Sequence, residues 1–207
     1  MYLNKPLEEY LADLASAKST PGGGSAAALS GAMAAALACM VARLTLIKAD
    51  YAAVHPEIEI LLQNSEQVLE RFQQLMQADI DAYGQLSACF KMPRTTEQER
   101  AARIQSVQAA LLNAALVPLE MVEQAAQLVQ YCQRIAEIGN KNVLSDIATA
   151  TALVSSAGTG ASWMVRTNLR SMKDLQQIEA LSIRLSAALD TITMTSQQIV
   201  SVVGERA

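Results

Sequence analysis

A chain of 207 residues is long enough for one domain with a sizeable core, or for two small ones at most. Hydrophobic residues make up 51% of it and charged residues 17%, proportions that exclude a disordered chain. The net charge is -4 and no basic patch stands out, so we expect no nucleic-acid partner. Aromatic residues account for only 4%, which leaves aliphatic residues to build the core and favours tightly packed helices over a sheet.

Two helices are predicted near the N-terminus, one over residues 4–17 and a longer one over residues 25–52 that is capped by Ser25. Residues 25–42 carry no charge and reach the lower length limit of a membrane-spanning helix. About half of them are Ala or Gly, which favour lipid only weakly, and Arg43 follows directly. We therefore interpret this stretch as a buried core helix and expect no membrane partner. The chain does not open like a signal peptide, and we expect a cytoplasmic protein.

Four further helices are predicted from apolar residues that recur at intervals of three and four. They cover residues 56–90, 96–138, 140–157 and 178–203. Proline and glycine predict the breaks between them, at His55–Pro56, the turn 91–94, Gly139 and Gly158–Gly160. A kink is predicted at Pro118.

No stretch alternates with period two for long enough to form a strand. We predict an all-α fold, a single-domain helical bundle of five to six main helices over residues 1–207. Extensive Ala-rich faces need more cover than one bundle supplies, so we also expect a homodimer.

The residue types that commonly hold metal ions are scattered along the chain. Cys39, Cys89 and Cys132 lie far apart in predicted helices, and we interpret them as free thiols. His55 is the one histidine; it stands beside a proline in a predicted loop, where we expect it to be solvated. We expect neither a metal site nor a tightly bound cofactor. Residues 97–103 are typical of a solvated helix face.

Asp79 falls within the apolar stripe of the helix predicted over residues 56–90. At about 100° per residue, it points within roughly 40° of the direction shared by Leu61, Ser65, Phe72, Met76 and Tyr83. A carboxylate directed into a core costs several kcal/mol unless it is paired or hydrogen-bonded. Two interpretations remain open: Asp79 pairs with a cation such as Arg43 or Lys48, or it lines a polar pocket.

The glycine turn Gly22–Gly24 follows Pro21 and precedes Ser25. It lacks both the Gly-Lys-Ser/Thr ending of a Walker loop and the preceding strand of a dinucleotide fingerprint. It is either an ordinary capped turn, or a helix N-terminus whose free backbone N–H groups bind a carbonyl or carboxylate ligand.

Four polar residues crowd the start of the helix predicted over residues 140–157, namely Asn140, Asn142, Ser145 and Asp146. Asn142 and Asp146 are one helical turn apart and share a side. Helix capping accounts for one asparagine and the aspartate, and a binding site accounts for all four.

Together these stretches resemble the cyclodeaminase/cyclohydrolase family of folate enzymes, in order and spacing and over essentially the whole chain. The matching motifs are "TPGGGSAAALSGAMAAALACMVARLT", "LIKADY", "ADIDAY...FKMP" and "GNKNVLSDIATATAL". That family comprises the C-terminal domain of formiminotransferase-cyclodeaminase and stand-alone methenyltetrahydrofolate cyclohydrolases. The resemblance implies an all-helical subunit that dimerises and binds a tetrahydrofolate derivative between helices near the dimer interface. Any formimino substrate would then come from a separate formiminotransferase.

The resemblance also implies roles for individual residues. Catalytic roles fall to Asp79, Asp146 and Lys48, and substrate-binding roles to Gly22, Gly23, Gly24, Ser25, Tyr51, Asn140, Asn142 and Ser145. Two activities fit. In cyclohydrolysis water adds to the methenyl carbon, whereas in cyclodeamination N10 attacks the formimino carbon and ammonia leaves. An alternative from another class is a non-catalytic helical dimer that binds a small ligand or a protein partner.

Overall fold

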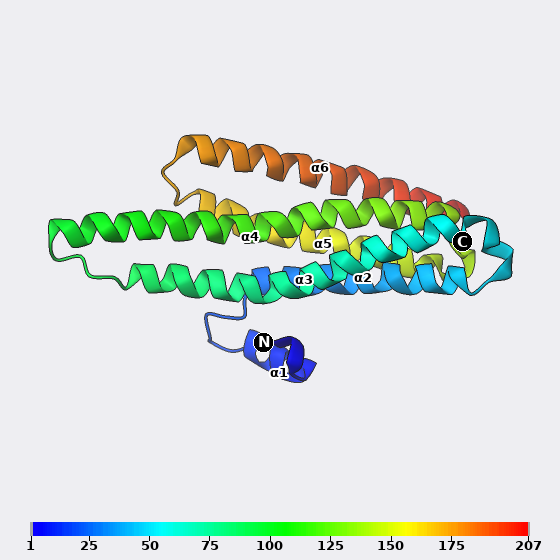
Figure 1. Ribbon diagram of the computed structural model, residues 1–207, viewed down its shortest axis with the longest axis horizontal. Helices are drawn as coiled ribbons and strands as arrows, with labels where there is room; N and C mark the ends of the chain where they lie inside the picture. Colours follow the sequence, from blue (N-terminus) through cyan, green and yellow to red (C-terminus); the bar gives the residue numbers. More distant parts are fainter. Residues whose placement is uncertain (1, 207) are drawn as a thin grey trace.

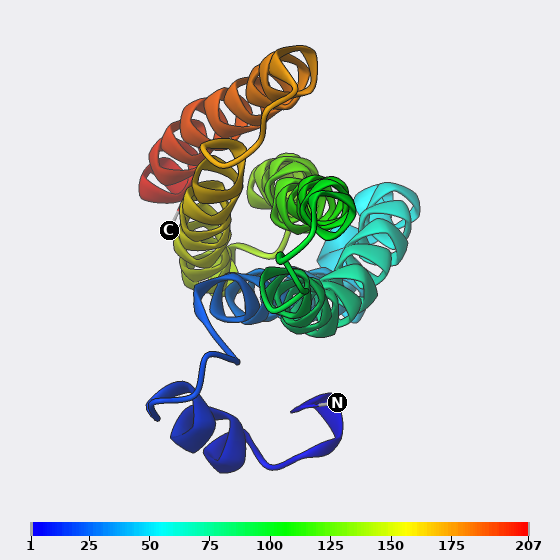
Figure 2. The same ribbon diagram turned by 90° about the vertical axis from the view of Figure 1, so that its left-hand side faces the viewer.

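The computed structural model describes residues 2–206 and shows six α-helices and no strand within them (Figures 1 and 2). The helices are α1 (Leu7–Leu14), α2 (Gly23–Leu46), α3 (His55–Phe90), α4 (Glu97–Ile138), α5 (Leu144–Leu169) and α6 (Leu175–Arg206). Short 3-10 turns are η1 (Tyr2–Asn4), η2 (Ala49–Val54) and η3 (Lys141–Val143). The predicted all-α bundle of five to six main helices is confirmed.

The five long helices, α2 to α6, lie side by side along the length of the molecule (Figure 1). Seen end-on, α2, α3, α4 and α5 surround the core, and α6 covers α4 and α5 (Figure 2). The short helix α1 stands apart beneath α2 in both views and is joined to it by residues 15–22.

The small residues of α2 place it deep in the bundle, between α3 and α5. Of its 24 residues, 13 are buried, and most of these are Ala or Gly. A Cβ at Gly31 would lie 2.4 Å from Cε1 of Phe72, so α3 packs directly on the α2 backbone. Among the described helices, α2 is the one long and apolar enough to cross a membrane. Its packing between neighbouring helices confirms the interpretation as a core helix.

The predicted boundaries of α4 are confirmed by its end groups. Thr96 caps the helix and forms a capping box with Glu99, in which each side chain accepts from the backbone N–H of the other. The helix continues through Pro118 and ends before Gly139.

Several other boundaries differ from the prediction. The first helix covers only residues 7–14, and α2 begins at Gly23 with Gly22 as its N-cap, so Ser25 lies inside the first turn. α2 ends at Leu46 rather than at residue 52. His55 begins α3, is half-buried, and places Nε2 3.2 Å from the Lys48 carbonyl oxygen, so the predicted solvated loop is wrong.

The predicted break at Gly158–Gly160 is also wrong, because α5 runs unbroken from Leu144 to Leu169. A Cβ at Gly158 would lie 2.6 Å from Cδ1 of Ile192 on α6. The glycine therefore allows α5 and α6 to approach closely, instead of forming a turn.

All three cysteines are free, as predicted. Cys39 and Cys132 are buried, and burial raises the pKa of their thiols to about 11 and about 12. These thiols remain protonated at neutral pH and act as small core residues.

Candidate active site

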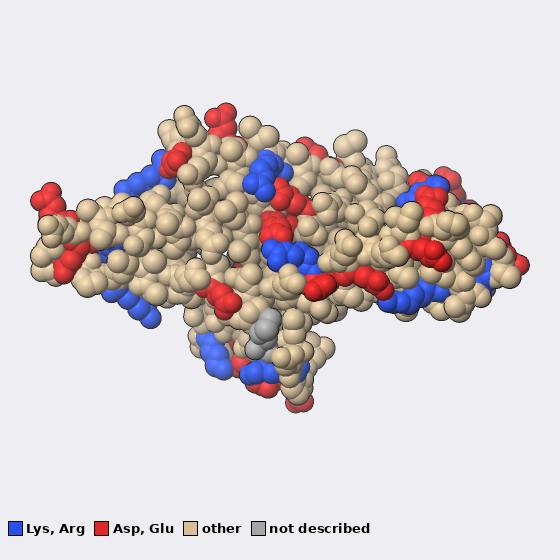
Figure 3. All heavy atoms as spheres, viewed as in Figure 1, with Lys and Arg blue, Asp and Glu red and all other residues tan. Residues whose placement is uncertain are grey.

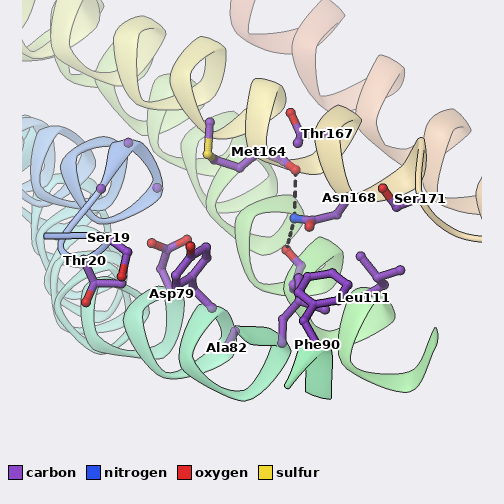
Figure 4. Close-up of a pocket in the computed structure, with 16 residues that line it drawn as sticks. Ser19, Thr20, Asp79, Ala82, Phe90, Leu111, Met164, Thr167, Asn168 and Ser171 are labelled. Carbon is purple, nitrogen blue, oxygen red and sulfur yellow. Dashed lines mark hydrogen bonds between the residues drawn. The ribbon is translucent and has the colours of Figure 1, made fainter. Parts of the chain in front are cut away.

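A pocket of about 360 Å³ opens between the N-terminus of α2, the second half of α3, α4 and the end of α5 (Figure 4). Its apolar wall comes mainly from Ala82, Leu86, Phe90, Leu111, Ala114 and Met164. Its polar groups belong to the glycine turn and to Ser19, Thr20, Asp79, Thr167, Asn168 and Ser171. An apolar cleft with a few converging polar groups is the usual form of a small-molecule site.

Asp79 lies at the end of this pocket that is nearest the start of α2 (Figure 4). Its carboxylate accepts a hydrogen bond from the backbone N–H of Ser25, in the first turn of the helix. Gly22 at the N-cap has no side chain to make such a bond, so Asp79 supplies the cap from α3. Arg43 pairs with Glu66 instead, and Asp79 forms no ion pair within residues 2–206. Of the two interpretations of Asp79, the one in which its side chain lines a pocket is confirmed.

Burial raises the pKa of the Asp79 carboxyl above its usual range, and the hydrogen bond from the Ser25 N–H opposes part of that rise. A carboxyl group with a raised pKa exchanges its proton more readily as the pH approaches neutrality. The group is therefore suited to acid–base chemistry on a ligand in the pocket.

Gly24 is required by the position of Asp79. A Cβ at Gly24 would lie 2.0 Å from Oδ1 of Asp79, so no larger residue fits without displacing the carboxylate. Gly23 differs, since a Cβ there would lie 3.6 Å from Cε of Met164, an ordinary contact distance. Both glycines line the pocket, yet only Gly24 is dictated by a close approach.

Tyr10, which the sequence analysis did not single out, anchors α1 beside the same turn. It is the only buried residue of α1, and its Oη lies 3.3 Å from Oγ of Ser25. Burial raises the pKa of its phenol, and the negative charge of Asp79 raises it further. Tyr10 therefore remains a neutral hydrogen-bonding group next to the carboxylate.

Asn168 is a second pocket residue that the sequence analysis missed. Its Nδ2 donates to the carbonyl oxygens of Ala114 at 2.7 Å and Met164 at 2.9 Å (Figure 4). Both amide hydrogens are thus used, which leaves Oδ1 as an acceptor for a ligand. Asn168 lies on the same helix face as the buried residues Ala161 and Val165, and this spacing is a signal in the sequence. The sequence analysis missed it because it predicted a break within α5.

The other predicted site residues gather where α2 ends and α5 begins. The Tyr51 Oη accepts a hydrogen bond of 3.0 Å from the Lys141 backbone N–H. Asn140 is only 3% exposed; its Nδ2 donates to the Leu44 carbonyl oxygen and its Oδ1 accepts from the Asn142 backbone N–H. The capping interpretation is confirmed for Asn140, whose side chain joins α2 to the start of α5.

Four side chains of this second group make no hydrogen bond to any other residue in the range 2–206, so their polar atoms remain available to a ligand or partner. Asn142 and Ser145 are exposed, whereas Lys48 and Asp146 are half-buried. We refer to Lys48, Tyr51, Asn140, Asn142, Ser145 and Asp146 as the distal group.

Within one chain, the distal group lies far from Asp79. Gly24 touches Asp79, whereas Oγ1 of Thr45, near the other end of α2, accepts a hydrogen bond from the Asn140 backbone N–H. At 1.5 Å per residue, α2 rises roughly 32 Å between Gly24 and Thr45. The structure therefore divides the predicted site residues into two groups at opposite ends of the core helix.

Comparison with known proteins agrees with this arrangement of helices and motifs. The formiminotransferase-cyclodeaminase family model matches residues 6–187. The chain belongs to the formiminotransferase-cyclodeaminase family. The methenyltetrahydrofolate cyclohydrolase of Methylorubrum extorquens is 33% identical to this chain, and the match covers 93% of this chain and 96% of that one. The formimidoyltransferase-cyclodeaminase of Rattus norvegicus is 30% identical over 90% of this chain, which spans only 35% of that longer protein.

A protein of known structure has the same fold. The formiminotetrahydrofolate cyclodeaminase of Thermotoga maritima superimposes with a TM-score of 0.90 at 28% identity, and the match covers 99% of this chain and 98% of that one.

Within residues 2–206 of this chain, no three His, Cys, Asp or Glu side chains lie close enough together to hold a metal ion.

Proposed function

We propose that this protein is a folate one-carbon enzyme acting on the carbon that bridges N5 and N10 of tetrahydrofolate. It acts as a methenyltetrahydrofolate cyclohydrolase, a formiminotetrahydrofolate cyclodeaminase, or both. The observation that carries the proposal is the buried carboxylate of Asp79 at the head of an apolar pocket, in a chain 33% identical to a cyclohydrolase over 96% of that enzyme. That near-complete match favours the cyclohydrolase reaction.

In the cyclohydrolase reaction the substrate is a cationic amidinium, N5–CH–N10. The ionised Asp79 stabilises this cation and removes a proton from the water that attacks the bridging carbon. The resulting tetrahedral carbon then breaks its bond to N5, which takes up a proton, and 10-formyltetrahydrofolate is released. One water molecule is consumed and one proton is lost overall.

In the cyclodeaminase reaction N10 attacks the formimino carbon carried by N5. A tetrahedral carbon again forms between the two nitrogens, and the former imine nitrogen leaves as ammonia after protonation. A carboxyl group that can both donate and accept a proton serves each reaction, which is why one site suits both. A separate formiminotransferase would supply this substrate.

The remainder of the pocket fits the rings of a folate. Its apolar wall includes Phe90, Leu111 and Met164, which can pack against flat aromatic groups. The free Oδ1 of Asn168 offers an acceptor to an N–H group of the substrate. The unpaired N–H groups at the glycine turn offer donors to a carbonyl oxygen.

We further propose that the protein acts as a homodimer. α2 and its C-cap residue present an apolar stripe to solvent through Met33, Met40 and the C-cap Ile47, which is 77% exposed. The N-terminal segment stands away from the bundle (Figure 2) and exposes Leu3 of η1 and Leu7 and Leu11 of α1. An apolar surface of this kind on a core helix needs cover, and a second copy supplies it.

Symmetric pairing would also reunite the divided site. In an antiparallel pair of α2 helices that cross at Ala36, between Met33 and Met40, Gly24 lies level with the partner's Lys48, just beyond the end of α2, because both are 12 positions from the crossing point. The distal group of one copy then faces Asp79 of the other. The partner's Lys48 can protonate a leaving nitrogen, and the partner's Asp146 can hold the substrate cation.

The test is the loss of the near-ultraviolet absorbance of methenyltetrahydrofolate with purified protein, against a control without enzyme at the same pH. Accelerated loss establishes cyclohydrolase activity. Ammonia release from 5-formiminotetrahydrofolate, measured in parallel, establishes cyclodeaminase activity. If neither reaction is accelerated, the non-catalytic helical dimer becomes the better description.

A further inference from the structure

The N-terminal segment, residues 2–18, satisfies its own charges. Lys5 pairs with Glu9 and Lys18 pairs with Asp13. Figure 3 shows these blue and red side chains together on the part of the molecule that projects from the bundle. No ion pair of the described residues joins the segment to the bundle. Its attachment therefore depends on other contacts.

Tyr10 provides the main contact between this segment and the bundle. It is 2% exposed, and it is the one buried residue of α1. The ring of Tyr2 packs edge-on against it, with the ring centroids 5.3 Å apart. The Tyr2 Oη in turn donates to Oδ2 of Asp13 at 2.7 Å. The segment thus folds around Tyr10 and fixes the direction in which its phenol points.

The Tyr10 phenol and the Ser25 hydroxyl form an isolated buried pair. Their oxygens lie 3.3 Å apart, and Ser25 is fully buried. Within residues 2–206 neither hydroxyl has another hydrogen-bond partner. A buried hydroxyl that loses its partner is costly, so each of these groups holds the other in place.

Ser25 connects this pair to Asp79. Its backbone N–H donates to the Asp79 carboxylate, while its hydroxyl meets Tyr10. Tyr10 itself is close enough to the carboxylate for that negative charge to raise the pKa of its phenol. Three elements, α1, α2 and α3, therefore meet at one carboxylate.

The linker between α1 and α2 forms part of the pocket wall. Ser19, Thr20 and Gly22 all line the pocket, and Figure 4 shows Ser19 and Thr20 next to Asp79. The linker is held by Tyr10 on one side and by the start of α2 on the other. The N-terminal segment is therefore a structural part of the site.

No second charge faces the Asp79 carboxylate from the described residues that line the pocket. The titratable groups beside it are two phenols, Tyr10 of α1 and Tyr83 of α3. The other helices contribute uncharged residues: the glycine turn of α2, Leu111 and Ala114 of α4, and Met164, Thr167, Asn168 and Ser171 of α5. Exclusion of water, rather than a neighbouring ion, therefore controls the protonation of Asp79.

We propose that Tyr10 is a positioning residue of the active site. Through the Ser25 hydroxyl it holds the first turn of α2 against Asp79, and its ring keeps water from the carboxylate on the side of α1. The inference rests on the proposed function, which makes Asp79 the acid–base group. A small displacement of such a group from its reacting partner slows the chemical step, so Tyr10 acts on kcat without touching the substrate.

The first test is a double-mutant cycle between Tyr10 and Ser25. Tyr10→Phe keeps the ring and removes the phenol, so kcat should fall about three- to tenfold with little change in KM. In a Ser25→Ala background the same change should have little further effect on kcat, because the partner hydroxyl is already absent. Tyr2→Phe is the matched control, since it removes a phenol of the same segment that bonds Asp13 instead, and it should leave kcat unchanged.

The second test measures the access of water to Asp79. Tyr10→Ala removes the ring, so the pKa of Asp79 should fall towards the ordinary value of 3.8. The acidic limb of the kcat/KM profile should then move to lower pH, whereas Tyr10→Phe should leave it in place. Carbon-13 NMR titration of the Asp79 carboxyl reads the same shift without substrate, and its signal is identified by its absence from Asp79→Asn.

The outcomes separate the two proposals. Additive effects in the cycle, or an unchanged titration of Asp79 in Tyr10→Ala, overturn the role of Tyr10 alone. A parent protein that turns over neither folate overturns the proposed function.

Discussion

At the scale of single residues, Asp79 combines two effects of opposite sign on stability. The Ser25 N–H stabilises its carboxylate, whereas burial destabilises the charged form, and burial dominates because the pKa is raised. A carboxyl whose pKa is higher in the folded state stabilises the fold when protonated. That contribution is lost as the pH rises from the ordinary value of 3.8 through the raised folded value.

The first prediction concerns Asp79→Asn. Turnover should fall by about 10²–10⁴-fold, the range of a lost acid–base group. At pH 7 the free energy of unfolding should rise by about 1 kcal/mol, since a buried charge is removed. Urea denaturation as a function of pH should show this gain disappearing as the pH falls towards 3.8. A variant less stable than the parent at pH 7 would mean that the hydrogen bond to Ser25 outweighs burial.

The second prediction uses the two glycines as a matched pair. Gly24→Ala should displace the Asp79 carboxylate, reduce kcat at least tenfold and lower the free energy of unfolding by about 1–3 kcal/mol. Gly23→Ala meets only Met164 at contact distance and should leave the unfolding free energy within about 0.5 kcal/mol of the parent. Equal loss of activity in both variants would contradict the account of Gly24.

At the scale of elements, the close contact of α2 with α3 depends on Gly31. The rigid ring of the buried Phe72 occupies the space that a Cβ would need. The contrast is Gly84, on the exposed side of α3, where a Cβ would meet nothing within 4 Å.

The third prediction follows from this contrast. Gly31→Ala should lower the free energy of unfolding by about 1–3 kcal/mol, because the two helices must separate. Gly84→Ala should raise it by about 0.5–1 kcal/mol through helix propensity. Chemical denaturation of both variants checks the pair, and a Gly31→Ala protein as stable as the parent would show that α2 and α3 can shift at no cost.

At the scale of the whole molecule, the separation of Asp79 from the distal group along α2 decides how many chains make one active site. A site within one chain would use only the pocket residues. A site between two antiparallel copies would use Asp79 of one and Lys48 of the other.

The fourth prediction separates these cases by mixing two inactive variants, Asp79→Asn and Lys48→Ala. Random re-association makes half of the dimers mixed, and each mixed dimer has one intact site if the site is shared. Activity should then recover to about one quarter of the parent value. No recovery, with subunit exchange verified by mass, would place each site within a single chain.

Much of the fold could be predicted from the sequence, because helix periodicity and capping are local. The apolar stripe of α3 identified Asp79, and Thr96 with Gly139 marked the ends of α4. The same reasoning failed at Gly158, because a glycine that permits close packing looks the same in sequence as one that forms a turn.

The sequence by itself thus determined the all-α class, the core helix α2, the motifs of the family and the buried carboxylate. Only the tertiary structure decided which of these residues meet. It put Asn168 in the same pocket as Asp79, set Tyr10 against Ser25, placed the distal group at the other end of α2, and brought Gln108 of α4 next to Ser171. The physical reason is that hydrogen bonds within a helix link residues a few positions apart, whereas a pocket forms where distant helices cross.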